Sequence, residues 1–282
     1  MLYATAFKGN PLTLAGRRLE EGKIAPSFRV INNDLKEVRL ADFKGKIKLI
    51  SSFPSLDTPV CDLQVKEFNK KAAGLSSDIQ VIGISKDLPF AQSRFCSMNE
   101  IKNETVLSDY KYSSFAINYG LLIKELNLLA RAVLIIDKND ILRYLQIVPE
   151  LTTPPDYKAA IDKLEDVIRN PSFSSGDYSL HCKPCEGGVL PLAQEKVNRL
   201  MAQHRGWEMV EDKKIVKEFK FRDFTDAKYF LDLVSAVSEE EGHHPVQVLS
   251  YGKVKVTLTT HAAGGLTEND FILAGIIDNL GI

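Results

Sequence analysis

The sequence has little cysteine and tryptophan, and it lacks long runs of one charge. Of its 282 residues, four are cysteine and one is tryptophan, and the formal net charge is -1. So few cysteines cannot form a disulfide framework in a chain of this size, which favours catalytic or metal-binding roles for them in a reducing compartment. Because about five or more like charges never follow one another, we expect neither nucleic acid nor a membrane surface as a partner.

Long apolar stretches are also missing. No segment of about 18 uncharged apolar residues occurs, so no transmembrane helix is expected. The N-terminus has no positively charged segment before an apolar core, so we expect no secretory signal and a cytoplasmic location. Hydrophobic residues make up 44% and charged residues 26%, which is typical of globular proteins. The length favours two domains.

The first half alternates short apolar runs with amphipathic segments. A helix between two such runs makes the flanking strands parallel, because crossover connections are right-handed. A Gly9-Asn10 pair predicts a β-hairpin within residues 1–18, and Lys138-Asn139-Asp140 joins the last two strands in another hairpin. The predicted strands are 47–53, 79–85, 132–137 and 141–148, and the predicted helices are 60–73 and 156–169.

A small, polar segment separates this half from a second one. Residues 170–180 have the composition of a linker, which gives domains at 1–169 and 181–282. Helices and antiparallel strands in about 100 residues favour an α+β domain. Its predicted helices are 193–204, 225–241 and 267–280, and its predicted strands are 208–210, 214–221 and a hairpin within 246–260.

Cys61 lies where a predicted buried strand meets a helix. A cysteine in the first helical turn faces unpaired N–H groups and the positive end of the helix dipole, which favour the nucleophilic thiolate. Thr58 can place a hydroxyl near the sulfur, and Pro54 can exclude water from one side. Arg131 stands in an apolar strand and needs an anionic partner, for which a thiolate would serve. Taken alone, Cys61 would equally suit a small buried hydrophobe.

The pattern Pro-x-x-x-Thr-x-x-Cys resembles the active-site motif of peroxiredoxins. The bacterial thiol peroxidases are the closest resemblance, and it extends over nearly all of residues 1–168. It is carried by Phe7-Lys8-Gly9-Asn10-Pro11, Ser55-x-Asp57-Thr58-x-Val60-Cys61, Asp87-Leu88-Pro89-Phe90-Ala91-Gln92-Ser93-Arg94-Phe95-Cys96 and Ala130-Arg131-Ala132-Val133. The resemblance implies an α/β thioredoxin-like fold for this domain.

The same resemblance implies an atypical two-cysteine peroxidase. Cys61 would attack hydrogen peroxide or an organic hydroperoxide and become a sulfenic acid. Thr58 and Arg131 would polarise the peroxide and stabilise the developing negative charge. Cys96 would form a disulfide with Cys61, which a thioredoxin-like reductant would then reduce. The rival interpretation, a non-catalytic thioredoxin-fold binding module, requires neither Thr58, Arg131 nor Cys96.

All five histidines lie in the second half, and three of them can converge. His243 and His244 follow a predicted helix, and His261 ends the returning strand of the hairpin. Neutral imidazoles suit general acid–base catalysis at about pH 7. Three histidines near a carboxylate also suit zinc or iron, and a solvated structural cluster is a third possibility. The spacing alone does not decide between them.

This region resembles the pterin-4a-carbinolamine dehydratases. The resemblance covers residues 182–281 and rests on Glu239-x-x-x-His243-His244-Pro245, Tyr251, His261, Asp270, Gly206-Trp207 and Phe221-x-Asp223-Phe224. It implies loss of water from a 4a-hydroxytetrahydropterin, without a metal. In that reaction His243 and His261 would be acid and base, and His244 would bind the pterin. Asp270 and Glu239 would tune the histidines. Pro245-Val246-Gln247-Val248 departs from the family, in which an aromatic residue follows.

Some features allow two interpretations. Trp207 would line the pterin site or belong to the core, and Asp270 would also cap a helix. Cys182 and Cys185 form a lone C-x-x-C, interpreted as local structure rather than half of a zinc site or a redox pair.

The whole sequence predicts a bifunctional enzyme with peroxide and pterin substrates and no bound cofactor. We also expect a homo-oligomer. The alternative for the second domain is a regulatory dimerisation module.

Overall fold

The computed structural model describes residues 4–72, 74–170, 182 and 190–281. The chain divides into two compact units, residues 1–178 and 179–280. Of the expected linker at 170–180, all but Asn170 lies outside the described residues, as does Cys185. Each unit is therefore described by itself.

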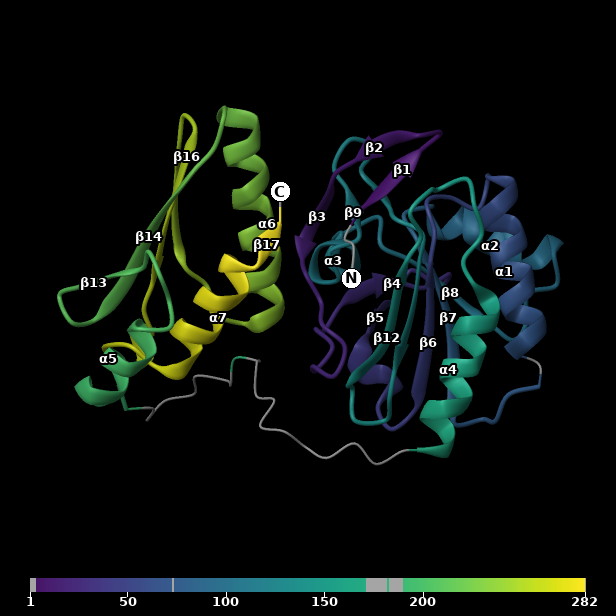
Figure 1. Ribbon diagram of the computed structural model, residues 1–282, viewed down its shortest axis with the longest axis horizontal. Coiled ribbons are helices and arrows are strands. Elements are labelled where there is room, and N and C mark those ends of the chain that lie inside the picture. Colours follow the sequence, from purple (N-terminus) through teal and green to yellow (C-terminus); the bar gives the residue numbers. More distant parts are fainter. Residues whose placement is uncertain (1–3, 73, 171–181, 183–189, 282) are drawn as a thin grey trace. The chain divides into compact units, whose positions relative to one another are not determined.

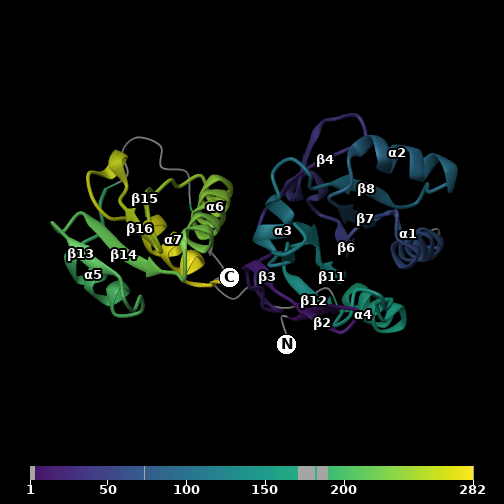
Figure 2. The same cartoon turned by 90° about the horizontal axis from the view of Figure 1, so that it is seen from above.

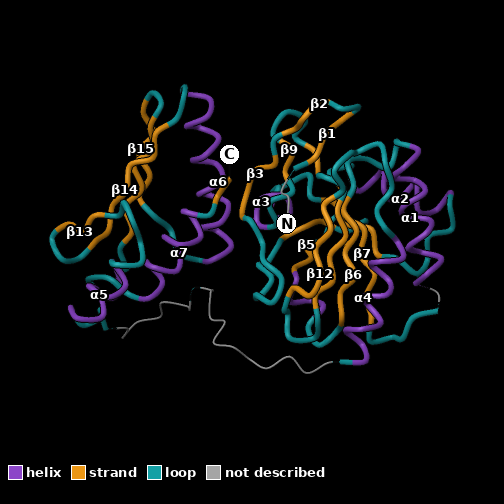
Figure 3. Tube along the Cα trace, viewed as in Figure 1, coloured by secondary structure: helices purple, strands orange, loops and turns teal. Residues whose placement is uncertain are grey.

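A seven-stranded mixed sheet forms the centre of the first unit (Figures 1 and 3). Its strands β6 and β7 are parallel, with Ile47 opposite Ile79, as the β-α-β pattern predicts. Strand β11 runs antiparallel to both β6 and β12. In the order β12-β11-β6-β7-β8-β4-β5, the strands are Leu142–Ile147, Ala132–Ile136, Ile47–Ser52, Ile79–Ser85, Thr105–Ser108, Arg29–Ile31 and Glu37–Arg39.

Helices cover both faces of this sheet. Figure 2 shows α1 (Pro59–Ala72), α2 (Pro89–Met98) and α4 (Tyr157–Arg169) on one face and the short α3 (Ser114–Asn118) on the other. Every residue of β6 is buried, as expected for a strand covered on both sides. A single 3₁₀ turn, η1 (Leu40–Phe43), connects β5 to β6. The sheet thus presents the carboxyl ends of β6 and β7 to the N-termini of α1 and α2.

A hairpin precedes the main sheet. Strands β1 (Thr5–Phe7) and β2 (Asn10–Leu12) turn at Lys8 and Gly9, whose φ angles are 51° and 79°. Two central residues with positive φ are typical of a type I′ turn. The turn therefore begins one residue before the Gly9-Asn10 pair on which it was predicted. Strands β3 (Leu14–Arg17), β9 (Leu122–Ile123) and β10 (Leu128–Leu129) pair beside it.

An antiparallel four-stranded sheet forms the second unit, as the sequence predicts. Its order is β13-β14-β16-β15, and the strands are Glu208–Val210, Lys214–Lys220, Lys253–Leu258 and Val246–Ser250. Helix α6 packs on β15 and β16 and on α7 (Figure 1). The remaining elements are α5 (Gln194–Met201), α6 (Phe224–Glu241), the 3₁₀ turn η2 (His261–Ala263), α7 (Glu268–Asp278) and β17 (Leu280–Gly281).

Local signals explain the ends of the longest helix of this unit. Helix α6 begins after Asp223, whose carboxylate accepts the N–H of Asp226 at 2.9 Å. It ends at Gly242, which adopts a φ of 63°. This end directly precedes the two adjacent histidines. No helix in the described parts of the chain is long and apolar enough to cross a membrane.

Candidate active sites

Two donors converge on the sulfur of Cys61. The Thr58 hydroxyl donates to Sγ at 2.7 Å, and Nη2 of Arg131 donates to it at 3.3 Å. Cys61 lies in the first turn of α1 and is fully buried. A hydroxyl and a guanidinium on one sulfur stabilise its thiolate, and both would also meet an oxygen bound beside it. The structure thus brings together the three residues that the sequence singled out.

Arg131 is held in place by groups that sequence reasoning did not find. Its side chain is 1% exposed, and the Leu151 carbonyl accepts from Nη2 at 2.8 Å and from Nε at 3.2 Å. Nη1 donates to the Oε1 atom of Gln64. Gln64 is itself anchored, because its Nε2 donates to Ser51 Oγ at 2.6 Å and to the Ser52 carbonyl at 3.2 Å. The sequence did hold one signal for Gln64: it is a polar residue on the apolar side of α1, one turn after Cys61.

The loop before Cys61 is tied to the start of the next helix. Pro54 is buried in this loop, directly after Phe53 and the end of β6. Asp87, just before α2, accepts the Ser55 hydroxyl at 2.7 Å and the N–H of Leu56 at 2.8 Å. Asp87 therefore fixes the peptide that leads to Thr58 and Cys61. The sequence contained this aspartate only as part of a motif, without a role.

Cys96 lies on α2 as a free thiol, and Cys61 is free as well. Cys96 packs against the apolar cluster that contains Cys61, Phe53 and Val65. Burial, followed by the charge of Glu104, raises the pKa of the Cys96 thiol to about 11. In this arrangement Cys96 is a thiol and a weak nucleophile, whereas Cys61 has two donors on its sulfur.

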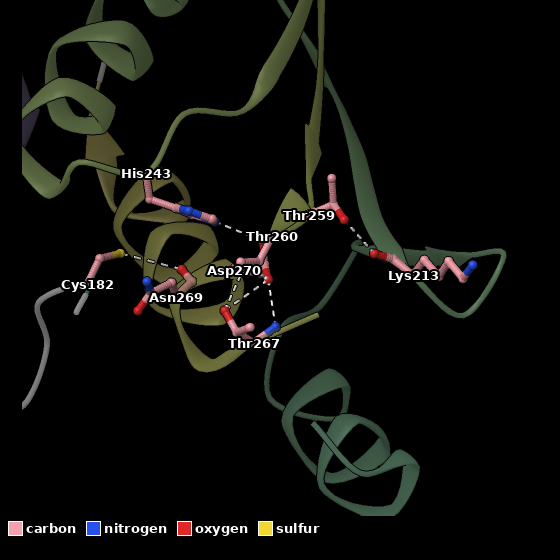
Figure 4. A network of polar contacts seen from close by, with 8 residues as sticks. All are labelled: Cys182, Lys213, His243, Thr259, Thr260, Thr267, Asn269 and Asp270. Carbon is pink, nitrogen blue, oxygen red and sulfur yellow. Dashed lines mark hydrogen bonds and ion pairs between the residues drawn. The ribbon is translucent and has the colours of Figure 1, made fainter. Parts of the chain in front are cut away.

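In the second unit, a buried carboxylate connects a histidine to a helix N-terminus (Figure 4). The Nε2 atom of His243 pairs with Asp270 Oδ1 at 2.8 Å. The Oδ2 atom of Asp270 accepts the Thr260 hydroxyl at 2.9 Å and the N–H of Thr267 at 2.7 Å. Asp270 thus caps α7 and orients His243 at the same time, so the two roles considered for it are compatible.

The other two histidines are exposed and lie at the edges of this network. The Nε2 atom of His244 pairs with Glu239 Oε2 at 3.0 Å, so Glu239 orients His244. His261 begins η2 and directly follows Thr260, whose hydroxyl binds Asp270.

Trp207 lies elsewhere in the second unit. The indole is 5% exposed and packs edge-on against Phe219, with ring centroids 6.2 Å apart. Its N–H donates to Asp278 at 3.0 Å. Asp278 is the last residue of α7, whereas Asp270 lies in the first turn of that helix. The structure therefore places Trp207 in the core, at the opposite end of α7 from His243.

Cys182 reaches the N-terminal end of α7. Its N–H donates to Glu241 Oε2 at 2.9 Å, and its thiol points to the Asn269 carbonyl at 3.6 Å (Figure 4). Within the described ranges, no three His, Cys, Asp or Glu side chains gather as a metal site would require.

Comparison with known proteins assigns the two units to different families. Residues 20–161 match the Redoxin family, and residues 190–280 match the family described as Pterin 4 alpha carbinolamine dehydratase. A thiol peroxidase from Halalkalibacterium halodurans is 49% identical over 161 residues, which are 57% of this chain and 96% of that protein. The thiol peroxidase of Bacillus subtilis is 45% identical over 163 residues, which are 58% of this chain and 97% of that protein.

A solved structure supports the fold of the first unit. A crystal structure of a peroxiredoxin-like protein from Aquifex aeolicus is 42% identical, with a TM-score of 0.56. The alignment covers 59% of this chain and 98% of that one. The first unit is therefore a peroxiredoxin with a thioredoxin-like fold, as predicted. More narrowly, the chain belongs to the thiol peroxidase family, and a pterin carbinolamine dehydratase family domain is fused after it.

Proposed function

We propose that the first unit reduces hydrogen peroxide and organic hydroperoxides through Cys61. The thiolate attacks one peroxide oxygen, an S–O bond forms, the O–O bond breaks, and the second oxygen leaves as water or alcohol after taking up a proton. Thr58 and Arg131 stabilise the thiolate before attack and the departing oxygen afterwards. The observation that carries this proposal is that both donate to the Cys61 sulfur, at 2.7 and 3.3 Å.

The second half of the peroxidase cycle uses Cys96. Its thiolate attacks the sulfur of the Cys61 sulfenic acid, so that an S–S bond forms and the S–O bond breaks. The hydroxide leaves and becomes water with the proton that the Cys96 thiol has lost. A thioredoxin-like dithiol then takes over the disulfide and returns both cysteines to thiols. The free thiols and their shared apolar cluster support this pairing.

Rapid mixing with peroxide tests this cycle. Cys61→Ser should abolish peroxide consumption. Cys96→Ser should consume one peroxide per chain and accumulate a sulfenic acid that dimedone traps. Thr58→Val should slow the first step by about 100-fold, as expected for loss of one preorganised donor. Unchanged peroxide consumption by Cys61→Ser would refute the assignment.

For the second unit we propose dehydration of a 4a-hydroxytetrahydropterin to the quinonoid dihydropterin. One histidine of the pair His243 and His261 protonates the departing hydroxyl, and the other accepts the proton from the pterin ring, so that water is the only by-product. The buried pairing of His243 with Asp270 supports this role, because it fixes the ring through Nε2. The other nitrogen, Nδ1, would then exchange a proton with the substrate. His244, paired with Glu239, would contact the pterin.

Turnover of a synthetic carbinolamine, followed by absorbance, tests this second activity. We expect His243→Ala and His261→Ala each to lower the rate by about 100-fold, as for a positioned acid or base. Gln203→Ala is a control in the same unit, outside the network. If both histidine variants retain the wild-type rate, the assignment of His243 and His261 as acid and base is refuted. A wild-type chain without turnover would instead favour the regulatory dimerisation module.

A further inference from the structure

Glu104 is a buried carboxyl group without a hydrogen-bond partner. The residue is 6% exposed, and neither Oε1 nor Oε2 has a partner among the residues that the structure describes. A buried carboxyl without a hydrogen-bond partner lowers the stability of the folded state, and its ionised form lowers that stability further. Glu104 stands between α2 and β8, outside the set of residues that contact the Cys61 sulfur. Its position needs an explanation that peroxide attack does not provide.

The carboxyl group occupies a niche over β7, beside the cluster that the two cysteines share. A Cβ atom at Gly83 would lie 2.5 Å from Oε1 of Glu104 and 3.3 Å from the Phe53 ring. Phe53 belongs to the cluster with Cys61, and Cys96 packs on that cluster. Glu104 thus lies near the Phe53 ring, which belongs to the cluster against which Cys96 packs.

Burial raises the pKa of Glu104 well above its ordinary value. When Glu104 is ionised, its charge raises the pKa of Cys96 on α2 and of Tyr157 on α4. The neighbouring positions, Phe53 directly after β6 and Gly83 on β7, carry no titratable group. Burial therefore favours the neutral form of Glu104 in this structure, and a movement of α2 that admits water would favour the carboxylate.

Disulfide formation requires the sulfurs of Cys61 and Cys96, which are both free thiols here, to come within bonding distance. Cys61 is fully buried, both cysteines are free thiols, and the Cys96 thiol is held protonated by burial. The loop after α2 is fastened to α1, because the N–H groups of Lys102 and Asn103 both donate to Asn69 Oδ1, at 3.0 and 2.8 Å. Something must offset these contacts if Cys96 is to leave the cluster.

We propose that Glu104 destabilises the closed state, in which Cys96 on α2 packs against the cluster around Cys61. Glu104 thereby promotes opening, the movement of α2 that brings Cys96 to the Cys61 sulfenic acid. This positioning role rests on the proposed peroxidase cycle. It affects disulfide formation and leaves peroxide attack unchanged.

The sign of the pH dependence follows from linkage. The pKa of Glu104 is raised in the closed state, so its contribution to that state is fully present below the open-state value of about 4.3 and is lost as pH rises. Because the shift is upward, ionisation of Glu104 favours opening increasingly as the pH rises above that value.

The test uses the full chain with Glu104→Gln and Glu104→Met, neither of which can ionise. Glu100→Gln is the matched control, because Glu100 is exposed and lies just after the end of α2, in the same connection to β8 as Glu104. After mixing with hydrogen peroxide, samples are quenched with dimedone or acid over milliseconds to seconds. Peptide mass spectrometry then gives the rates of Cys61 oxidation and of Cys61–Cys96 disulfide formation.

At pH 7.5 we expect both Glu104 variants to oxidise Cys61 at the wild-type rate but to form the disulfide at least about tenfold more slowly. The ratio of wild-type to variant rates should fall towards one as the pH is lowered to about 4, where Glu104 is largely protonated in both states. Any dependence on the Cys96 thiolate cancels in this ratio. Wild-type disulfide rates in both variants, a ratio independent of pH, or equal slowing of both steps would each overturn the proposal. If the wild type forms no Cys61–Cys96 disulfide at all, the peroxidase cycle fails with it.

Discussion

Gln64 offers the sharpest test of how the peroxidase site is held together. Gln64→Met keeps the size of the side chain but removes the acceptor for Arg131 Nη1 and the two bonds that Nε2 makes to Ser51 and Ser52. Because the guanidinium is 1% exposed, water cannot replace the lost acceptor. The substitution therefore leaves a buried positive group with one partner fewer.

The size of the effect follows from these bonds. A hydrogen bond to a charged group contributes about 1.5–3 kcal/mol and a neutral one about 1 kcal/mol, so the free energy of unfolding should fall by roughly 3–5 kcal/mol. Loss of one preorganised donor costs about 100- to 1000-fold in rate. Because the Leu151 carbonyl still accepts two bonds from Arg131, we expect a smaller loss of about 10- to 100-fold in Cys61 oxidation.

Stopped-flow peroxide consumption and urea unfolding measure the two effects. Gln80→Met is the control, because the Gln80 amide donates to Thr105 Oγ1 at 3.0 Å on the neighbouring strand, away from Arg131. It should lower stability by about 1 kcal/mol and leave peroxide attack intact. If peroxide oxidises Cys61 as fast in Gln64→Met as in Gln80→Met, Gln64 does not position Arg131 for peroxide attack.

Three further predictions concern other parts of the chain. The N–H groups of Gly9, Thr152 and Lys8 lower the pKa of Glu150 to about 2; its stabilising effect is present above about pH 4.3 and disappears towards pH 2. Glu150→Gln should therefore have a lower melting temperature than the wild type at pH 7 and the same melting temperature at pH 2. Equal melting temperatures at pH 7 would contradict this prediction. With a pKa of about 11, Cys96 in a Cys61→Ser chain should react with iodoacetamide at pH 8 at least about tenfold more slowly when native than in urea, as mass spectrometry would show. Trp207→Phe should lower the free energy of unfolding by about 1.5–3 kcal/mol, because the hydrogen bond to Asp278 is lost, and carbinolamine turnover should persist. Loss of turnover would instead support a role for Trp207 in binding the pterin.

Sequence patterns predicted the elements that repeat a period several times. Strands β6 and β7 with α1 between them, and α4 and α6, are long enough for periodicity to show. Strands of two to four residues, such as β4, β5 and β9, complete no period, and their pairing is decided only by the assembled sheet. Helix α2 was not among the predicted helices, because its apolar pattern is weak.

The residues of the first unit's site also divide into those that a local sequence pattern predicts and those that only the folded sheet brings together. Thr58 and Cys61 lie three positions apart on one helical turn, so sequence spacing predicts their contact. Gln64 meets Arg131 only because β11 lies beside β6 in the sheet, which no local pattern encodes. The charge of Glu104 suggests a surface position, and its burial appears only in the folded unit, where its carboxyl lies beside Gly83 and Phe53.

A chain of bonds makes the N-terminal hairpin part of the peroxidase site. The hairpin turn donates the N–H groups of Lys8 and Gly9 to Glu150, and the N–H of Leu151 donates to the Ala6 carbonyl at 2.9 Å. The carbonyl of Leu151 then accepts both bonds that aim Arg131 at Cys61. Because a guanidinium needs its acceptors fixed to keep its direction, we expect the hairpin to support the proposed peroxide attack without supplying a catalytic side chain. The motif around Gly9 therefore belongs to the same function as the motif around Cys61.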